Sequence, residues 1–140
     1  MRTLIALRGV ANCGKSVTIK KAYHLLKEAY PRASVEELFV GADITIIMTI
    51  KGTNLGIESQ GDPNSRLSKS LKRFVELGCK VIICATRTSG LTYEAVSNLA
   101  SQYMITWLDK LKTPTVQEQE AANEVVAKEI FEEAQSAINA

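Results

Sequence analysis

The chain has 140 residues, of which 46% are hydrophobic and 23% are charged, a composition typical of one globular domain spanning residues 1–140. The formal net charge of +2 excludes the strongly basic surface that would indicate nucleic acid as a partner. Three cysteines without a C-x-x-C pair, and no apolar run near the roughly 18 residues that span a bilayer, predict a cytoplasmic protein with no membrane partner.

The first elements surround a glycine-containing turn. The apolar run Thr3–Arg8 predicts a strand buried on both faces. Ile19, Tyr23 and Leu26 then recur at helical spacing, which predicts a helix from about residue 14 to residue 30, ended by Pro31. The turn between the two elements is therefore a strand-to-helix connection.

A period of two replaces the helical period in residues 36–60. The side chains of Ile44, Ile46, Met48 and Ile50 share one face of a predicted strand. The segment "KGTNLG" then turns the chain into a second strand at Leu55, which predicts an antiparallel hairpin. The segment "ELFV" is a candidate third strand that turns at Gly41.

Helices and strands alternate in the rest of the chain. A first helix is predicted for "NSRLSKSLKRFVELG" (64–78), with an apolar stripe of Leu67, Leu71, Phe74 and Leu77. A second is predicted for "LTYEAVSNLASQY" (91–103). A third spans 116–138, where Thr115 and Glu118 form a capping-box pattern at its start. The predicted strands are "CKVIICA" and "MITWLD". This order predicts an α/β fold with a mainly parallel sheet, an antiparallel hairpin at one edge and helices on both faces. Ligands of such sheets bind at the carboxyl ends of the strands.

The segment Gly9–Ser16, "GVANCGKS", lies at such an end and fits the pattern G-x-x-x-x-G-K-[ST] without a mismatch. Glycines allow a loop to bring its backbone N–H groups close to phosphate oxygens, and the following helix adds unpaired N–H groups. A lysine and a hydroxyl at the last two positions suit the β and γ phosphates and a magnesium ion. The pattern therefore predicts a phosphate-binding loop.

On these residues the chain resembles the P-loop NTPase superfamily. The resemblance implies a three-layer P-loop NTPase-type fold, a nucleoside triphosphate as ligand, either ATP or GTP, and Mg²⁺ as cofactor. It also implies a catalytic role for Lys15 and a metal-binding role for Ser16. The implied nucleotide-binding residues are Gly9, Val10, Ala11, Asn12, Cys13, Gly14, Lys15, Ser16 and Val17.

A P-loop enzyme also requires a carboxylate near the metal, and "ESQGDP" offers two. Glu58 would end the strand that begins at Leu55, and "ESQG" is similar to the D-x-x-G element of the small GTPases, which assigns Gly61 to the γ-phosphate. Asp62 is the other candidate for binding the metal or positioning the attacking water. Both carboxylates are retained as candidate catalytic and metal-binding residues.

The base-recognition element departs from the GTPase pattern. After "CKVIICA" a GTPase would read [NT]-K-x-D, whereas this chain reads "TRTSG" and has no carboxylate there to pair with guanine. ATP is therefore favoured over GTP. Arg87 directly follows that strand, and we expect it to stack on a base, reach a transferred phosphoryl group or act as an arginine finger in cis or in a homodimer.

Three functions remain open from the sequence. The leading one is a magnesium-dependent nucleoside triphosphatase that hydrolyses ATP. The second is a small-molecule or nucleotide kinase, in which Arg87 and the basic stripe around Arg66 would hold an acceptor. The third is a module that senses a nucleotide without turning it over and reports its presence to a protein partner.

Overall fold

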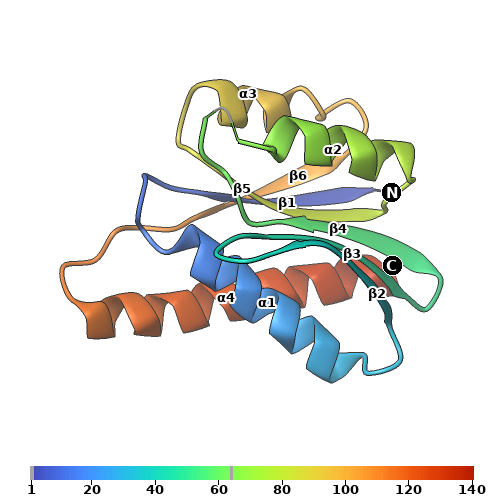
Figure 1. Cartoon of the computed structure of the whole chain (residues 1–140), viewed down its shortest axis with the longest axis horizontal. Coiled ribbons are helices and arrows are strands. Elements are labelled where there is room, and N and C mark those ends of the chain that lie inside the picture. The colour runs from blue at the N-terminus through green and yellow to red at the C-terminus, as the bar shows by residue number, and fades with distance from the viewer. Residues whose placement is uncertain (1, 64) are drawn as a thin grey trace.

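The computed structural model describes residues 2–63 and 65–140. These residues form a six-stranded mixed sheet and four helices (Figure 1). In chain order the elements are β1 (Thr3–Arg8), α1 (Lys15–Ala29), β2 (Ser34–Val40), β3 (Ile44–Ile50), β4 (Thr53–Glu58), α2 (Leu67–Glu76), β5 (Val81–Thr86), α3 (Leu91–Ser97), β6 (Met104–Asp109) and α4 (Val116–Asn139).

The strands lie in the order β2-β3-β4-β5-β1-β6. The pairs β4–β5, β5–β1 and β1–β6 are parallel, and β2, β3 and β4 form an antiparallel meander at one edge. The predicted α/β class, the mostly parallel sheet and the antiparallel edge are confirmed. Arg8 is in register with both Thr86 and Asp109, so β1, β5 and β6 end at the same level and deliver their following loops to one edge.

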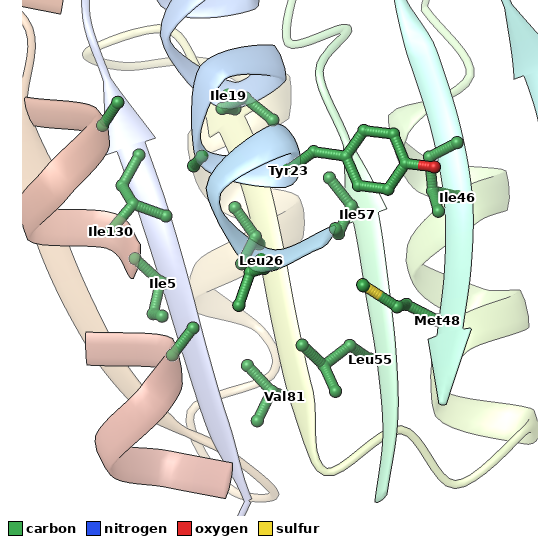
Figure 2. Packing of buried hydrophobic residues seen from close by; sticks show 14 of the residues in the cluster. Ile5, Ile19, Tyr23, Leu26, Ile46, Met48, Leu55, Ile57, Val81 and Ile130 are labelled. Atoms are coloured by element: carbon green, nitrogen blue, oxygen red, sulfur yellow. The ribbon is translucent and has the colours of Figure 1, made fainter. Parts of the chain in front are cut away.

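The helices cover the two faces of the sheet in pairs. Helices α1 and α4 lie side by side on one face, and α2 and α3 lie on the other (Figure 1). Beneath α1 and α4, Ile5 packs with Ile130, while Leu26 and Tyr23 face the side chains of the central strands (Figure 2). A second core under α2 and α3 contains Phe74. Burial of both faces explains why β1 and β5 consist almost entirely of apolar residues.

The hairpin between β3 and β4 turns through only two residues. Lys51 (φ 51°) and Gly52 (φ 80°) both adopt positive φ, as a two-residue turn of type I′ requires, and Ile50 pairs directly with Thr53. The second strand therefore begins at Thr53, two residues before the predicted start at Leu55. The predicted alternation of β3 is confirmed, because Ile44 and its partners at every second position line the core under α1.

Helix α2 packs on β4 through one close contact that the sequence pattern did not predict. A Cβ atom on Gly56 would overlap the ring of Phe74, so the helix approaches the strand at the one position that has no side chain. Leu77, which was expected on the buried stripe, is 45% exposed because the helix ends at Glu76. The predicted first residue of this helix, Asn64, lies outside the described residues.

The last two helices differ in how well their ends were predicted. Helix α3 ends at Ser97, well before the predicted residue 103, and turns lead from there into β6. Helix α4 begins as predicted, because the Thr115 hydroxyl accepts the Glu118 N–H at 3.1 Å. No helix in residues 2–63 and 65–140 combines the length and apolar character that crossing a membrane requires.

Candidate functional site

The glycine loop, residues 9–14, connects β1 to α1 at the carboxyl edge of the sheet. Asn12 (φ 58°) and Gly14 (φ 98°) adopt the left-handed conformation, which only glycine enters without steric cost. A Cβ on Gly14 would also lie 2.7 Å from Oδ1 of Asn123 in α4. Both the backbone conformation and the close approach of α4 therefore require glycine at position 14.

Lys15, the first residue of α1, reaches back across the glycine loop. Its Nζ donates to the carbonyl oxygens of Gly9 (2.8 Å) and Val10 (2.9 Å), and the residue is 7% exposed. Burial lowers the pKa of Lys15 below its ordinary value, and the negative potential of Cys13 and Asp62 opposes this effect. An ammonium group has three N–H donors, so one remains for an anion at the mouth of the loop.

The Ser16 hydroxyl lies within a cluster of oxygen atoms. Its Oγ is 2.8 Å from Oδ1 of Asp43, 3.1 Å from the Ala42 carbonyl and 3.3 Å from Oγ of Ser59. Ser59 Oγ donates to the same Asp43 oxygen at 2.9 Å and accepts the Ile44 N–H at 2.8 Å. Two hydroxyls and one carboxylate from three separate segments therefore converge beside the start of α1.

Asp43 is a site residue that sequence reasoning missed. It belongs to the short connection between β2 and β3, and the antiparallel hairpin folds this connection back onto the first turn of α1. The segment "GADI" matches no motif. Only the sheet order, with β3 and β4 bringing Asp43 and Ser59 to the same edge, reveals the carboxylate.

These groups line an open cavity of about 380 Å³ at the carboxyl edge of the sheet. The volume lies within the range of about 300–1,000 Å³ that is typical of small-molecule sites. The cavity is lined by Asn12, Gly14, Lys15, Ser16, Val17, Ala42, Asp43, Ser59, Asp62 and Gln119. Six of these were predicted as site residues from the sequence, and the structure brings all six together.

Asp62 and Arg87 meet at the same edge, in loops that follow β4 and β5. Arg87 Nε donates to Oδ1 of Asp62 at 2.9 Å, and the two side chains are 34% and 61% exposed. Asp62 lines the cavity. Arg87 is not part of the lining but is paired with Asp62. Because both side chains are accessible, an anion entering the cavity can compete with Asp62 for the guanidinium group.

Glu58 does not line the cavity. Its carboxylate is fully buried and accepts hydrogen bonds from Oγ1 of Thr45 and Oγ of Ser70, both at 2.6 Å, and from the N–H of Gln60 at 3.0 Å. Arg66 Nε lies 3.3 Å from the same group and completes its charge balance. Strand β5 separates β4 from β1. The structure therefore places Glu58 in a satisfied polar network beneath α2, away from the lining of the cavity.

The remaining predicted residues support the cavity or lie beside it. Gly61 is packed so tightly that a Cβ would lie 2.5 Å from the Ala85 carbonyl. Cys13 belongs to the glycine loop and is fully buried. The others, Gly9, Val10 and Ala11, form the first half of the loop and are not part of the cavity lining.

Two buried polar residues that the sequence did not suggest hold the glycine loop from below. Lys110, 2% exposed, donates from Nζ to the Cys13 carbonyl at 2.8 Å. Asn123, 3% exposed, accepts from Oγ1 of Thr18 at 3.1 Å. Asn123 offers a signal in retrospect, because it occupies the buried stripe of α4 with Ala127. Lys110 offers none.

The donor atoms beside Ser16 suit a magnesium ion. Mg²⁺ prefers hard oxygen ligands and is commonly held by one or two carboxylates together with substrate phosphates and water. Ser16, Asp43 and Ser59 supply hydroxyl and carboxylate oxygens of this kind. Within the described parts of the chain, no group of three or more His, Cys, Asp or Glu side chains could hold a metal.

Comparison of the chain with protein-family models, with curated proteins and with solved structures gave no match.

Proposed function

We propose that the protein binds a nucleoside triphosphate together with Mg²⁺ in the cavity above the glycine loop, in a P-loop NTPase-type fold, and hydrolyses it. The arrangement of Lys15 carries the proposal. Its ammonium group is buried and, among the described residues, donates hydrogen bonds to the backbone carbonyls of Gly9 and Val10. This leaves one N–H donor for a ligand. A phosphate oxygen is the acceptor that best repays burial of this charge.

The opposite wall of the cavity supports the assignment of the metal. Ser16 and Asp43 would hold Mg²⁺ beside the β and γ phosphates, and Ser59 would orient the Asp43 carboxylate through the 2.9 Å hydrogen bond. The ion supplies positive charge to the phosphate oxygens when bound. We assign this role to Asp43 ahead of Glu58, because Glu58 is fully buried and its oxygens are occupied by other partners.

Asp62 and Arg87 provide groups for the hydrolytic step. In that step water attacks the γ-phosphorus, the bond to the bridging oxygen breaks, and a nucleoside diphosphate and inorganic phosphate are formed. Asp62 lines the cavity and would accept the proton of the attacking water. Arg87, released from its ion pair with Asp62, would bind the γ-phosphate oxygens. ATP is the expected substrate because "TRTSG" contains no carboxylate for guanine.

Lys15→Ala tests the binding step by calorimetry with Mg²⁺ and ATP. We expect ATP affinity to fall at least a hundredfold, since a charge-assisted contact to the phosphates is lost. Lys21→Ala is the matched control, because Lys21 lies on the same helix and pairs with Glu124 at the surface. Equal affinity of Lys15→Ala and the wild type would refute the proposed phosphate site.

Phosphate release from ATP and GTP tests turnover. We expect magnesium-dependent release that is faster with ATP, and loss of release in Asp62→Asn with ATP binding largely retained. Release that requires a metabolite and yields a phosphorylated product would identify a kinase. Tight binding without release under any condition would identify a sensing module.

A further inference from the structure

A second cavity adjoins the first one on the side of α4. It has a volume of about 330 Å³ and is bounded by the β6–α4 connection, the first turns of α4 and α1. Val17 and Gln119 line both cavities. A ligand with its phosphates at Lys15 can therefore continue into the second cavity across these two residues.

The walls of the second cavity differ in chemistry from those of the first. Val17 and Val116 leave 48% and 74% of their surface exposed, and Pro114 also belongs to the lining. Such uncovered apolar groups suit the faces of a planar ring. Gln119 and Glu120 add an amide and a carboxylate, which together can accept and donate hydrogen bonds.

Charge argues against phosphate as the occupant of this second cavity. Glu120 lines it, and Glu118 lies in the same first turns of α4. Carboxylates at this position repel an anion, whereas they accept hydrogen bonds from hydroxyl and amino groups. The two cavities thus suit a single ligand whose polyanionic end lies in the first cavity and whose uncharged end, carrying N–H and O–H donors, lies in the second.

Asn123 connects the wall of the second cavity to the glycine loop. Asn123 lines this cavity, accepts a hydrogen bond from Thr18 and contacts the position at which Gly14 would carry a Cβ. The same buried residue therefore contacts the glycine loop and lines the second cavity. A preformed spacing of this kind favours one ligand that fills both cavities over two independent small ligands.

We infer that the second cavity binds the nucleoside of the triphosphate, with Val17 and Val116 in contact with the base and Gln119 and Glu120 hydrogen-bonded to the polar groups of the base or ribose. The inference rests on the proposed function, since it takes the phosphates to lie at Lys15 and Ser16. It assigns base and sugar recognition to the β6–α4 connection and the beginning of α4, a region in which the sequence indicates a helix start and no nucleotide-binding motif.

Val116→Asn and Glu120→Gln test this assignment, with calorimetry of Mg²⁺–ATP and Mg²⁺–tripolyphosphate, which has no nucleoside. Both positions are exposed on α4, so the fold should tolerate either change. We expect each variant to lower ATP affinity three- to tenfold and to leave tripolyphosphate affinity within twofold of the wild type. Loss of a carboxylate alone would strengthen the binding of any anion, so weaker ATP binding by Glu120→Gln indicates a direct contact.

Val125→Asn and Glu129→Gln are the matched controls, since both residues are exposed on the same helix and outside both cavities. We expect neither control to change the affinity for either ligand. If the wild type binds both ligands and the test variants bind ATP as tightly as the wild type, or lose both ligands equally, the nucleoside assignment is overturned and the phosphate site stands. If the wild type binds neither ligand, the proposed function fails and this inference fails with it.

Discussion

Ser16 Oγ donates a 2.8 Å hydrogen bond to Oδ1 of Asp43, which belongs to the connection between β2 and β3. This contact joins the first turn of α1 to the antiparallel edge of the sheet. It brings a carboxylate to the hydroxyl that ends the G-x-x-x-x-G-K-[ST] motif. The antiparallel hairpin therefore contributes directly to the candidate metal site, although the motif lies on the parallel part of the sheet.

Asp43→Asn should weaken magnesium binding while preserving the fold. The amide can still accept from Ser16, but it lacks the negative charge that attracts the cation. We expect the Mg²⁺ concentration at half-maximal ATP binding to rise about tenfold, as measured by calorimetry across a magnesium series. Asp109→Asn is the control, because Asp109 pairs with Arg8 at the same sheet edge. An unchanged magnesium requirement in Asp43→Asn would rule out the assigned role.

Glu58→Gln should affect stability rather than ligand binding. Removing the charge weakens the ion pair with Arg66, whose side chain is 25% exposed, and the hydrogen bonds from Thr45 and Ser70. Hydrogen bonds to a charged group contribute roughly 1.5–3 kcal/mol. We expect the free energy of unfolding in urea to fall by about that amount while ATP affinity stays within twofold. The surface variant Glu76→Gln should change neither quantity. A large loss of ATP affinity in Glu58→Gln, with stability intact, would instead favour a metal-binding role for this residue.

Gly56→Ala should destabilise the packing of α2 on β4. The added methyl group would overlap the ring of Phe74, which is fully buried, and overpacking of this kind costs about 1–3 kcal/mol. The double variant Gly56→Ala/Phe74→Leu should recover part of the loss, because a smaller side chain makes room for the methyl group. Urea denaturation of the wild type, both single variants and the double variant measures the coupling. Strictly additive effects would show that the predicted overlap is absent.

Tyr23 should make stability depend on alkaline pH. Burial raises the pKa of Tyr23 to about 12, and the neighbouring Glu37 carboxylate adds to the effect. The unfolded chain loses this phenol proton near pH 10, so the contribution of Tyr23 to stability is complete below pH 10 and is lost as pH rises toward 12. The unfolding free energy of the wild type minus that of Tyr23→Phe should decrease between pH 9 and pH 11. A constant difference would show that the phenol ionises equally in both states.

The strand-to-helix connections were predictable because each carries a strong local signal. The bounds of β1 and β6 follow from apolar runs, and the start of α4 follows from the Thr115 hydroxyl. The end of α3 was not predictable, because apolar residues continue past Ser97 in turns rather than in a helix. Local pattern thus predicted the existence of elements better than their ends.

The site was predictable only where the motif lies. Lys15 and Ser16 were found from the spacing of residues within one loop, whereas Asp43 reaches the cavity through the pairing of distant strands. Glu58 and Asp62 could not be separated from the sequence, because both follow the same strand within a few residues. Burial separates them: Glu58 is enclosed by Arg66 and its hydroxyl partners, and Asp62 opens onto the cavity.

The strand order also has a consequence for how the chain reaches its native state. Strands β2, β3 and β4 are consecutive in sequence and pair through short connections, so they can form early. In the described part of the chain, strand β1 pairs with β5 and β6, and its first residue, Thr3, is in register with Val81 and Met104. The glycine loop therefore acquires its final shape only after distant parts of the chain have assembled around β1. We expect competence to bind phosphate to appear among the last events of folding.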